Sequence, residues 1–233
     1  MNSQRTKRAL VTGGNRGIGF AISKGLLAAG YDVIITSRSL EDAKQAASQL
    51  GDGVMSVALD VSDDFSIEKA ANALSQNVEY LDVLVNNAGV YPDKNIDVLT
   101  VARDTLETAV NTNTFGVIKM VQAFLPLLEA SPEARVINVS SGMGSIDGLT
   151  TTAPSYCLSK LALNGATIML SQSLQSKGIA VNSVGPGWVK TDMGGSLAPR
   201  TPEQGADTVI WLAAEASHKE TGKFWRDRHE ISF

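Results

Sequence analysis

Thr12-Gly13-Gly14-Asn15-Arg16-Gly17-Ile18-Gly19 lies between a short apolar run, residues 9–11, and a stretch in which apolar residues have helical spacing. A strand, a glycine-rich turn and a helix in this order can hold a phosphate group, because glycine permits close backbone approach and a helix N-terminus offers free N–H groups. The spacing of the glycines differs from the GxGxxG dinucleotide fingerprint. From this stretch alone, a turn without a ligand remains the alternative.

The rest of the chain repeats the alternation of strand and helix. Short apolar, β-branched runs predict parallel strands buried on both faces, and amphipathic stretches predict helices. The expected strands are 9–11, 33–35, 54–59, 81–85, 135–139, 179–184 and a seventh near 222–225; the expected helices are about 17–29, 40–50, 62–77, 100–130, 154–177 and 202–216. This order predicts an α/β fold, a single domain over residues 1–233 with a Rossmann-type doubly wound parallel sheet of about seven strands and helices on both faces.

Composition excludes several functional classes. The 233 residues carry a net charge of -4 and no long basic block, so we expect no nucleic-acid partner. No apolar run is long enough for a signal segment or a membrane span, so we expect no membrane partner. The single cysteine, Cys157, cannot form an intrachain disulfide, which indicates a reducing compartment, the cytoplasm. No metal site is expected.

The end of the second predicted strand indicates which dinucleotide would bind. In dinucleotide folds an acidic residue at this place bonds the ribose 2′-OH. Here Ser37 and Arg38 follow the strand, and no acidic residue occurs before Glu41. Ser37 and Arg38, with Arg16 from the glycine turn, can instead hold a 2′-phosphate, so NADP(H) is the predicted cofactor. Alternatively, Arg38 is a solvated residue at the start of a helix.

Tyr156 and Lys160 are four residues apart, which places both on one face of a helix. An ammonium group near a tyrosine stabilises the phenolate and lowers the tyrosine pKa from about 10, which suits a general acid or base. The YxxxK spacing is common, and an exposed i,i+4 pair is its alternative explanation.

Four motifs together resemble the short-chain dehydrogenase/reductase family over nearly the whole chain: TGGNRGIG at 12–19, NNAG at 86–89, NVSS at 138–141 and YxxxK at 156–160. The stretches 186–195 and 222–228 resemble its NADPH-dependent carbonyl reductase-like subgroup. The resemblance implies that Asn113, Ser141, Tyr156 and Lys160 are the catalytic residues, with Asn111 and Ser140 as competing candidates for the first two.

The resemblance also implies a set of cofactor contacts at the ends of the strands. Asp60 would contact the adenine and Asn86 would brace the sheet, although strand-end caps are the simpler interpretation of both. The expected cofactor-binding residues are Gly13, Asn15, Arg16, Gly17, Ile18, Gly19, Ser37, Arg38, Asp60, Val61, Asn87, Ala88, Gly89, Tyr156, Lys160, Pro186, Gly187, Val189 and Thr191.

The implied activity is reduction of a ketone, aldehyde or quinone to an alcohol by NADPH, with tyrosine as the proton donor. The expected substrate loops, about 143–155 and 187–201, hold small and apolar residues, with Leu149, Met193 and Leu197 as predicted walls. They favour a small, mostly apolar carbonyl compound. Fifteen residues separate Ser141 from Tyr156, more than in many members, so the first loop should differ in detail.

Three questions stay open at this point. The fold also serves dinucleotide-binding sensors and contact-signalling proteins with little turnover, although those often lack the tyrosine or lysine present here. An NAD-linked alcohol dehydrogenase is disfavoured by the missing acid after the second strand. A homodimer or homotetramer would pair the helices at 100–130 and 154–177, where Ala162, Leu163, Ala166, Met169 and Leu170 could equally be core.

Overall fold

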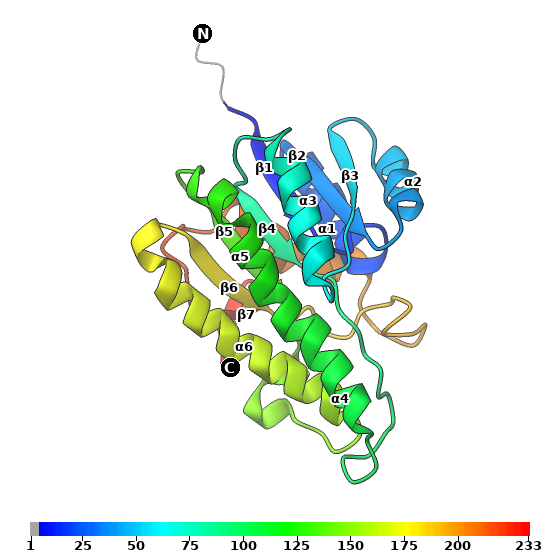
Figure 1. Cartoon of the computed structure of the whole chain (residues 1–233). Helices are drawn as coiled ribbons and strands as arrows, with labels where there is room; N and C mark the ends of the chain where they lie inside the picture. Colours follow the sequence, from blue (N-terminus) through cyan, green and yellow to red (C-terminus); the bar gives the residue numbers. More distant parts are fainter. Residues whose placement is uncertain (1–4) are drawn as a thin grey trace.

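The computed structural model describes residues 5–233 and contains one eight-stranded sheet with helices on both faces (Figure 1). The strand order is β3-β2-β1-β4-β5-β6-β7-β8, so the chain winds outward in both directions from β1. The strands are β1 (Lys7–Val11), β2 (Tyr31–Ser37), β3 (Val54–Ala58), β4 (Val83–Asn86), β5 (Arg135–Val139), β6 (Ala180–Val184), β7 (Phe224–Arg226) and β8 (His229–Ile231). The helices are α1 (Gly17–Ala28), α2 (Leu40–Leu50), α3 (Asp64–Ser75), α4 (Arg103–Val110), α5 (Gly116–Glu129), α6 (Pro154–Leu174) and α7 (Pro202–Ala214).

Two apolar cores lie on the two faces of the sheet. One core joins α3, α5 and α6 to the sheet around Phe124 and Met120, and these helices lie in front of the strands in Figure 1. The other joins α1, α2 and α7 around Ile22 and Leu26. Because helices cover both faces of the sheet, the sheet is open only at the two ends of its strands. The loops at the carboxyl ends of the parallel strands are therefore the expected place for a site.

The predicted doubly wound fold is confirmed, but two details of the predicted sheet are wrong. The sheet has an eighth strand, β8, which pairs antiparallel with β7 through a tight turn at Asp227 and Arg228. Both turn residues have positive φ, 50° and 61°, without being glycine, so the turn lacks the usual sequence signal. In addition, β3 is an edge strand that is only partly buried, because no strand lies beyond it, and its Met55 is exposed.

The predicted helix at 100–130 is continuous but contains a π-helical turn at Asn111–Phe115, between α4 and α5. The Gly116 N–H donates to the Asn111 carbonyl, five residues earlier. Asn113 and Gly116 are poor helix formers, which agrees with a departure from regular α-helix at this place.

Of the five α6 residues suggested for an assembly interface, some belong to the core and others lie on the surface. Leu163 and Ala166 are buried, and Leu170 packs against the core, whereas Ala162 and Met169 are exposed. Within residues 5–233, no helix is long and apolar enough to cross a membrane.

The packing predicts opposite effects for alanine at two helix glycines. A Cβ at Gly116 would lie 2.2 Å from the Val61 carbonyl oxygen, whereas a Cβ at Gly165 would meet nothing within 4 Å. We expect Gly116→Ala to lower the free energy of unfolding by about 1–3 kcal/mol, because the backbone must shift. Gly165→Ala should raise it by up to about 1 kcal/mol through helix propensity. Urea unfolding monitored by circular dichroism measures both, and equal effects would contradict the close approach at Gly116.

Candidate active site

In the glycine turn after β1, backbone segments approach one another closely. Gly13 and Gly17 have positive φ of 62° and 55°, and a Cβ at Gly19 would lie 2.2 Å from the Gly13 carbonyl oxygen. The Asn87 side chain donates to the Thr12 carbonyl at 2.9 Å and to the Gly13 carbonyl at 3.2 Å. Glycine is therefore required at these positions for steric reasons, and the loop after β4 holds the turn in place.

The N-terminus of α1 opens out of this turn. Its N-cap residue, Arg16, makes no side-chain cap, and the first turn of α1 contains no acidic residue. The Thr191 side chain lies above the turn, 3.2 Å from where a Cβ on Gly17 would be. Free N–H groups at a helix N-terminus beside a glycine cradle fit a pyrophosphate.

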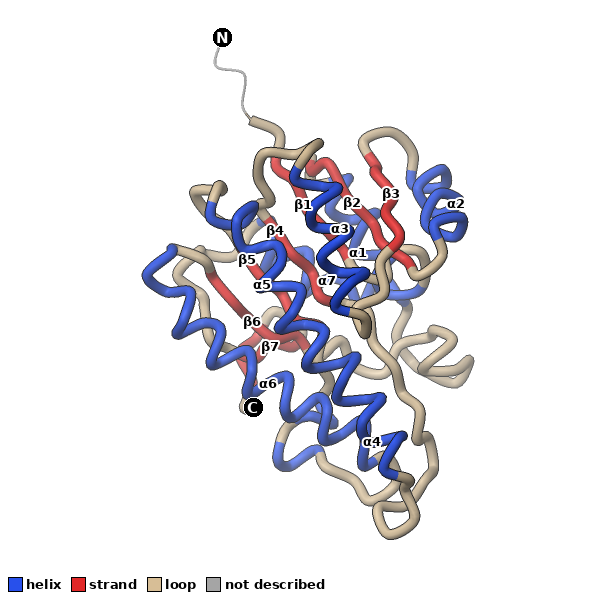
Figure 2. The backbone as a smooth tube through the Cα atoms, viewed as in Figure 1, coloured by secondary structure: helices blue, strands red, loops and turns tan. Residues whose placement is uncertain are grey.

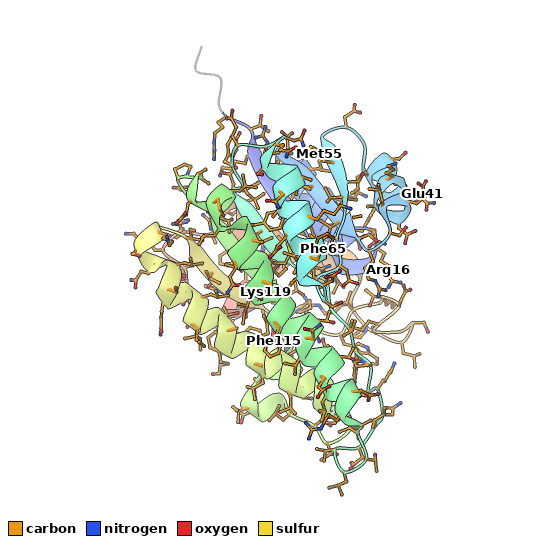
Figure 3. All side chains as sticks on the ribbon, in the orientation of Figure 1. Arg16, Glu41, Met55, Phe65, Phe115 and Lys119 are labelled. Carbon is orange, nitrogen blue, oxygen red and sulfur yellow. The ribbon has the colours of Figure 1, made fainter. Side chains whose placement is uncertain are left out.

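The corner predicted for the 2′-phosphate has one free cation and one paired cation. Arg38 is exposed at the end of β2 and forms no ion pair with any residue in the described part of the chain, whereas Ser37 is buried. Arg16, which Figure 3 labels, pairs with Asp192 in the loop after β6, and both side chains are largely exposed. An exposed pair contributes little stability, so Arg16 can exchange Asp192 for another anion at small cost.

Asp60 and Asn86 both form side-chain hydrogen bonds near the ends of their strands. Oδ1 of Asp60 accepts hydrogen bonds from the Ser62 N–H and hydroxyl at 2.9 and 2.7 Å, which is a strand-end turn. The Asn86 amide donates to Asn138 Oδ1 at 2.9 Å and so joins β4 to β5 between the two cores. Asn86 thus braces the sheet as a side-chain rung.

Tyr156 and Lys160 are both buried on the face of α6 that meets the sheet. Lys160 donates to the Val139 carbonyl at 2.8 Å, and burial lowers the Lys160 pKa to about 8. Burial raises the Tyr156 pKa to about 12, against the opposing effect of a hydrogen bond with Ser141. The sequence analysis predicted a lowered tyrosine pKa. The direction is opposite, because the loss of hydration outweighs an ammonium group 5.8 Å from the ring centre.

The two serines after β5 point to different places. The Ser140 hydroxyl is buried and donates to the Lys160 carbonyl at 3.4 Å. Ser141 accepts a hydrogen bond from the Met143 N–H at 3.1 Å and also reaches Tyr156. Of the two hydroxyls, only that of Ser141 adjoins the phenol.

The side chains of Asn113 and Asn111 also have different hydrogen-bond partners. The Asn113 amide is buried, accepts from the Val90 N–H at 2.8 Å and donates to the Val90 carbonyl at 2.9 Å and to the Ser159 hydroxyl at 2.9 Å. Asn111 instead donates to the Ser62 carbonyl at the exposed end of the sheet. A Cβ on Gly89 would touch both Asn113 Oδ1 and Lys160 Nζ, at 3.0 and 3.6 Å, so these groups converge on one small space.

Three neighbours of the site escaped the sequence analysis. The Tyr91 ring stacks on the Tyr156 ring, with centroids 4.4 Å apart. Asp93 is completely buried and accepts hydrogen bonds from the backbone at the start of α6. Arg226 at the end of β7 lies against the space beside Gly142, where a Cβ would be 2.4 Å from its guanidinium. Arg226 lies in the stretch 222–228 that resembles the carbonyl reductase-like subgroup, but that resemblance assigned it no role, and no motif included Tyr91 or Asp93.

The loops expected to contact a substrate follow β5 and β6, at the carboxyl ends of these parallel strands, and are among the tan segments of Figure 2. The first contains two short 3-10 turns, Gly142–Gly144 and Ile146–Gly148, and is tied to the loop after β4 by a hydrogen bond from the Val98 N–H to the Thr151 carbonyl. The second exposes Trp188, Met193 and Leu197. The predicted walls are therefore apolar side chains that are open to solvent.

Comparisons with known proteins identify the family of this chain. Residues 7–202 match the sequence profile of the short chain dehydrogenases. The chain is 34% identical over 240 residues to a short-chain dehydrogenase of Penicillium roqueforti, covering 95% of this chain and 94% of the relative. It is also 34% identical over 232 residues to a 3-oxoacyl-acyl-carrier-protein reductase of Vibrio harveyi, with 93% of both chains covered.

Solved structures with the same fold include two carbonyl reductases. The NADPH-bound carbonyl reductase from chicken fatty liver superposes with a TM-score of 0.89 at 30% identity, covering 98% of this chain and 100% of that chain. The carbonyl reductase Sniffer of Drosophila melanogaster gives a TM-score of 0.89 at 31% identity with the same coverage. On the profile, the relatives and the fold together, this chain belongs to the short-chain dehydrogenase family and is an oxidoreductase.

Proposed function

We propose that the protein is an NADP(H)-dependent carbonyl reductase that converts a ketone, aldehyde or quinone to an alcohol. The observation that carries the proposal is the convergence of Ser141, Tyr156 and Lys160 at the carboxyl edge of the sheet, beside a glycine turn that fits a pyrophosphate. Buried titratable groups of this kind, with strongly shifted pKa values, are typical of catalytic sites.

In this reaction Tyr156 donates a proton to the substrate oxygen. Its pKa, raised to about 12, keeps the phenol protonated at neutral pH, which is the form that a proton donor requires. Ser141 donates a hydrogen bond to the same oxygen as negative charge develops on it. Lys160 donates to the Val139 carbonyl and would hold the nicotinamide ribose of a bound cofactor. The nicotinamide, when bound, supplies the hydride.

The preference for NADP(H) rests on charge at the end of β2. Arg38 is an unpaired cation there, and no acidic residue occupies Thr36 to Leu40 to repel a 2′-phosphate. The chicken structure, which is NADPH-bound, supports the same choice. Arg16 would join Arg38 at the phosphate by leaving Asp192.

The substrate is proposed to be small and mostly apolar, since apolar side chains border the two loops. Leu149, Met193 and Leu197 remain the proposed walls. Relatives that are 3-oxoacyl-acyl-carrier-protein reductases make a 3-oxoacyl thioester the natural competing substrate.

We also propose that two or more copies associate through α5 and α6. Three large apolar side chains are exposed there: Phe115 at the π turn directly before α5, which Figure 3 labels, and Leu158 and Met169 of α6. Analytical ultracentrifugation should show a dimer or tetramer. A monomer at all concentrations would contradict the assembly and leave the activity untouched.

Replacement of the proposed proton donor tests the activity. With NADPH and a panel of aldehydes, ketones, quinones and a 3-oxoacyl thioester, we expect Tyr156→Phe to lower kcat by about 10²–10⁴-fold, the usual contribution of a general acid. NADPH affinity, measured by fluorescence titration, should change little. The matched control is Tyr80→Phe, because Tyr80 bonds the Thr6 carbonyl away from the site. NADPH binding without reduction of any compound would instead favour a sensor or signalling protein.

Removal of the free cation at the end of β2 tests the cofactor. Arg38→Ala should raise the KM for NADPH by about 10–100-fold, the worth of a charge-assisted hydrogen bond, and leave the KM for NADH nearly unchanged. Lys177→Ala, which breaks an exposed pair with Glu129, is the control for a general loss of surface charge. Equal losses with both cofactors would show that Arg38 does not distinguish them.

A further inference from the structure

The start of α6, which carries Tyr156, is capped by a residue from another part of the chain. The N-cap residue, Ala153, has no capping side chain, and Pro154 has no N–H. Asp93, in the loop after β4, supplies both missing acceptors: one carboxyl oxygen accepts from the Ser155 N–H at 2.5 Å and the other from the Tyr156 N–H at 3.4 Å. The cap therefore acts on the backbone of the proposed proton donor itself.

The same loop also holds the Tyr156 ring. Tyr91, two residues before Asp93, stacks on that ring with an interplanar angle of 25° and a centroid separation of 4.4 Å. The loop is fixed at its start, where Asn113 bonds both the N–H and the carbonyl of Val90. The loop after β4 thus contacts Tyr156 both at its backbone N–H and at its ring.

The burial of Asp93 calls for a physical reason. It is 0% exposed and forms no ion pair with a cationic side chain of residues 5–233. A buried carboxylate is costly unless hydrogen bonds or a positive charge compensate it. Here the positive end of the α6 dipole compensates it, together with the two N–H groups.

The carboxylate then affects the acidity of the neighbouring phenol. Tyr156 is the third residue of α6, where the helix dipole would stabilise a phenolate. A negative charge placed at this helix end would weaken that stabilisation and oppose ionisation of the phenol. The other groups facing Tyr156 are the Tyr91 phenol, the Cys157 thiol, the Ser141 hydroxyl and the Lys160 ammonium.

We propose that Asp93, together with Tyr91, is a positioning residue that fixes the Tyr156 phenol against the reacting carbonyl and keeps it protonated. The proposal rests on the proposed reductase activity. It adds a functional role for the loop after β4 beyond the contacts of residues 87–89.

The test compares the buried cap of α6 with an exposed helix cap that lies away from Tyr156. Asp93→Asn removes the charge and one acceptor at α6, and Asp63→Asn does the same at the N-cap of α3, where Asp63 accepts from the Phe65 N–H at 3.0 Å. Both variants should lose about 2–8 °C in Tm. Only Asp93→Asn should lower kcat, by about tenfold or more, because small displacements of a reacting group are costly. It should also move the alkaline limb of the kcat profile to lower pH, with NADPH affinity unchanged.

Variants at Tyr91 separate the ring contact from the cap. Tyr91→Phe keeps the stacked ring and should retain most of kcat, whereas Tyr91→Leu removes it and should lower kcat by several-fold without a change in NADPH affinity. If Asp93→Asn matches Asp63→Asn in Tm and matches the wild type in kcat and pH profile, Asp93 is only a structural cap and the proposal is overturned.

A second measurement does not depend on turnover. Stopped-flow pH jumps, with tyrosinate absorbance recorded before unfolding, report the ionisation of Tyr156 as the difference between each protein and its Tyr156→Phe derivative. In the Asp93→Asn background the Tyr156 phenol should ionise at lower pH than in the wild type. If the wild type reduces no compound, the reductase proposal fails alone and this titration still decides the effect of Asp93; an unchanged ionisation would overturn it.

Discussion

The buried amide of Asn113 joins the three segments on which the site depends. It bonds the Val90 peptide on both sides and the Ser159 hydroxyl, so one side chain ties the loop after β4 to α6 from the middle of the α4–α5 helix. The π turn at Asn111–Phe115 makes this possible. An extra residue in one turn rotates the following side chains by about 100°, so Asn113 can face the site while Met120 and Phe124 still face the core.

Burial at this junction favours the uncharged forms of both Tyr156 and Lys160. It lowers the Lys160 pKa to about 8 and raises the Tyr156 pKa to about 12, because a dry environment disfavours either charged form. At neutral pH the phenol therefore keeps its proton, while the lysine lies close to its own titration. In the proposed reaction, a proton lost from the phenol can be replaced by one from the Lys160 ammonium, which then regains its proton from solvent.

The sequence predicted features that depend on neighbours along the chain. The strand–helix alternation, the glycine turn and the Tyr156–Lys160 spacing are all local patterns, and the structure places them as expected. Features set by distant residues were missed or reversed. β8 was missed for a different, local reason, because its turn at Asp227 and Arg228 has positive φ without a glycine. The direction of the tyrosine pKa shift depends on burial, which spacing cannot measure.

Long-range capping explains why Asp93 in particular could not be found by local rules. Capping signals are sought within a few residues of a helix start, and at α6 such a search ends on Ala153 and Pro154, neither of which offers a capping oxygen. The other end of the sheet repeats the pattern, since Arg135 of β5 donates to the carbonyls of Leu212 and Ala216 at the end of α7. A helix that begins without a local cap yet carries a reacting side chain needs its cap from elsewhere in the fold. The missing cap is itself readable in the sequence, and it directs the search toward buried acids in the loops at the same edge of the sheet.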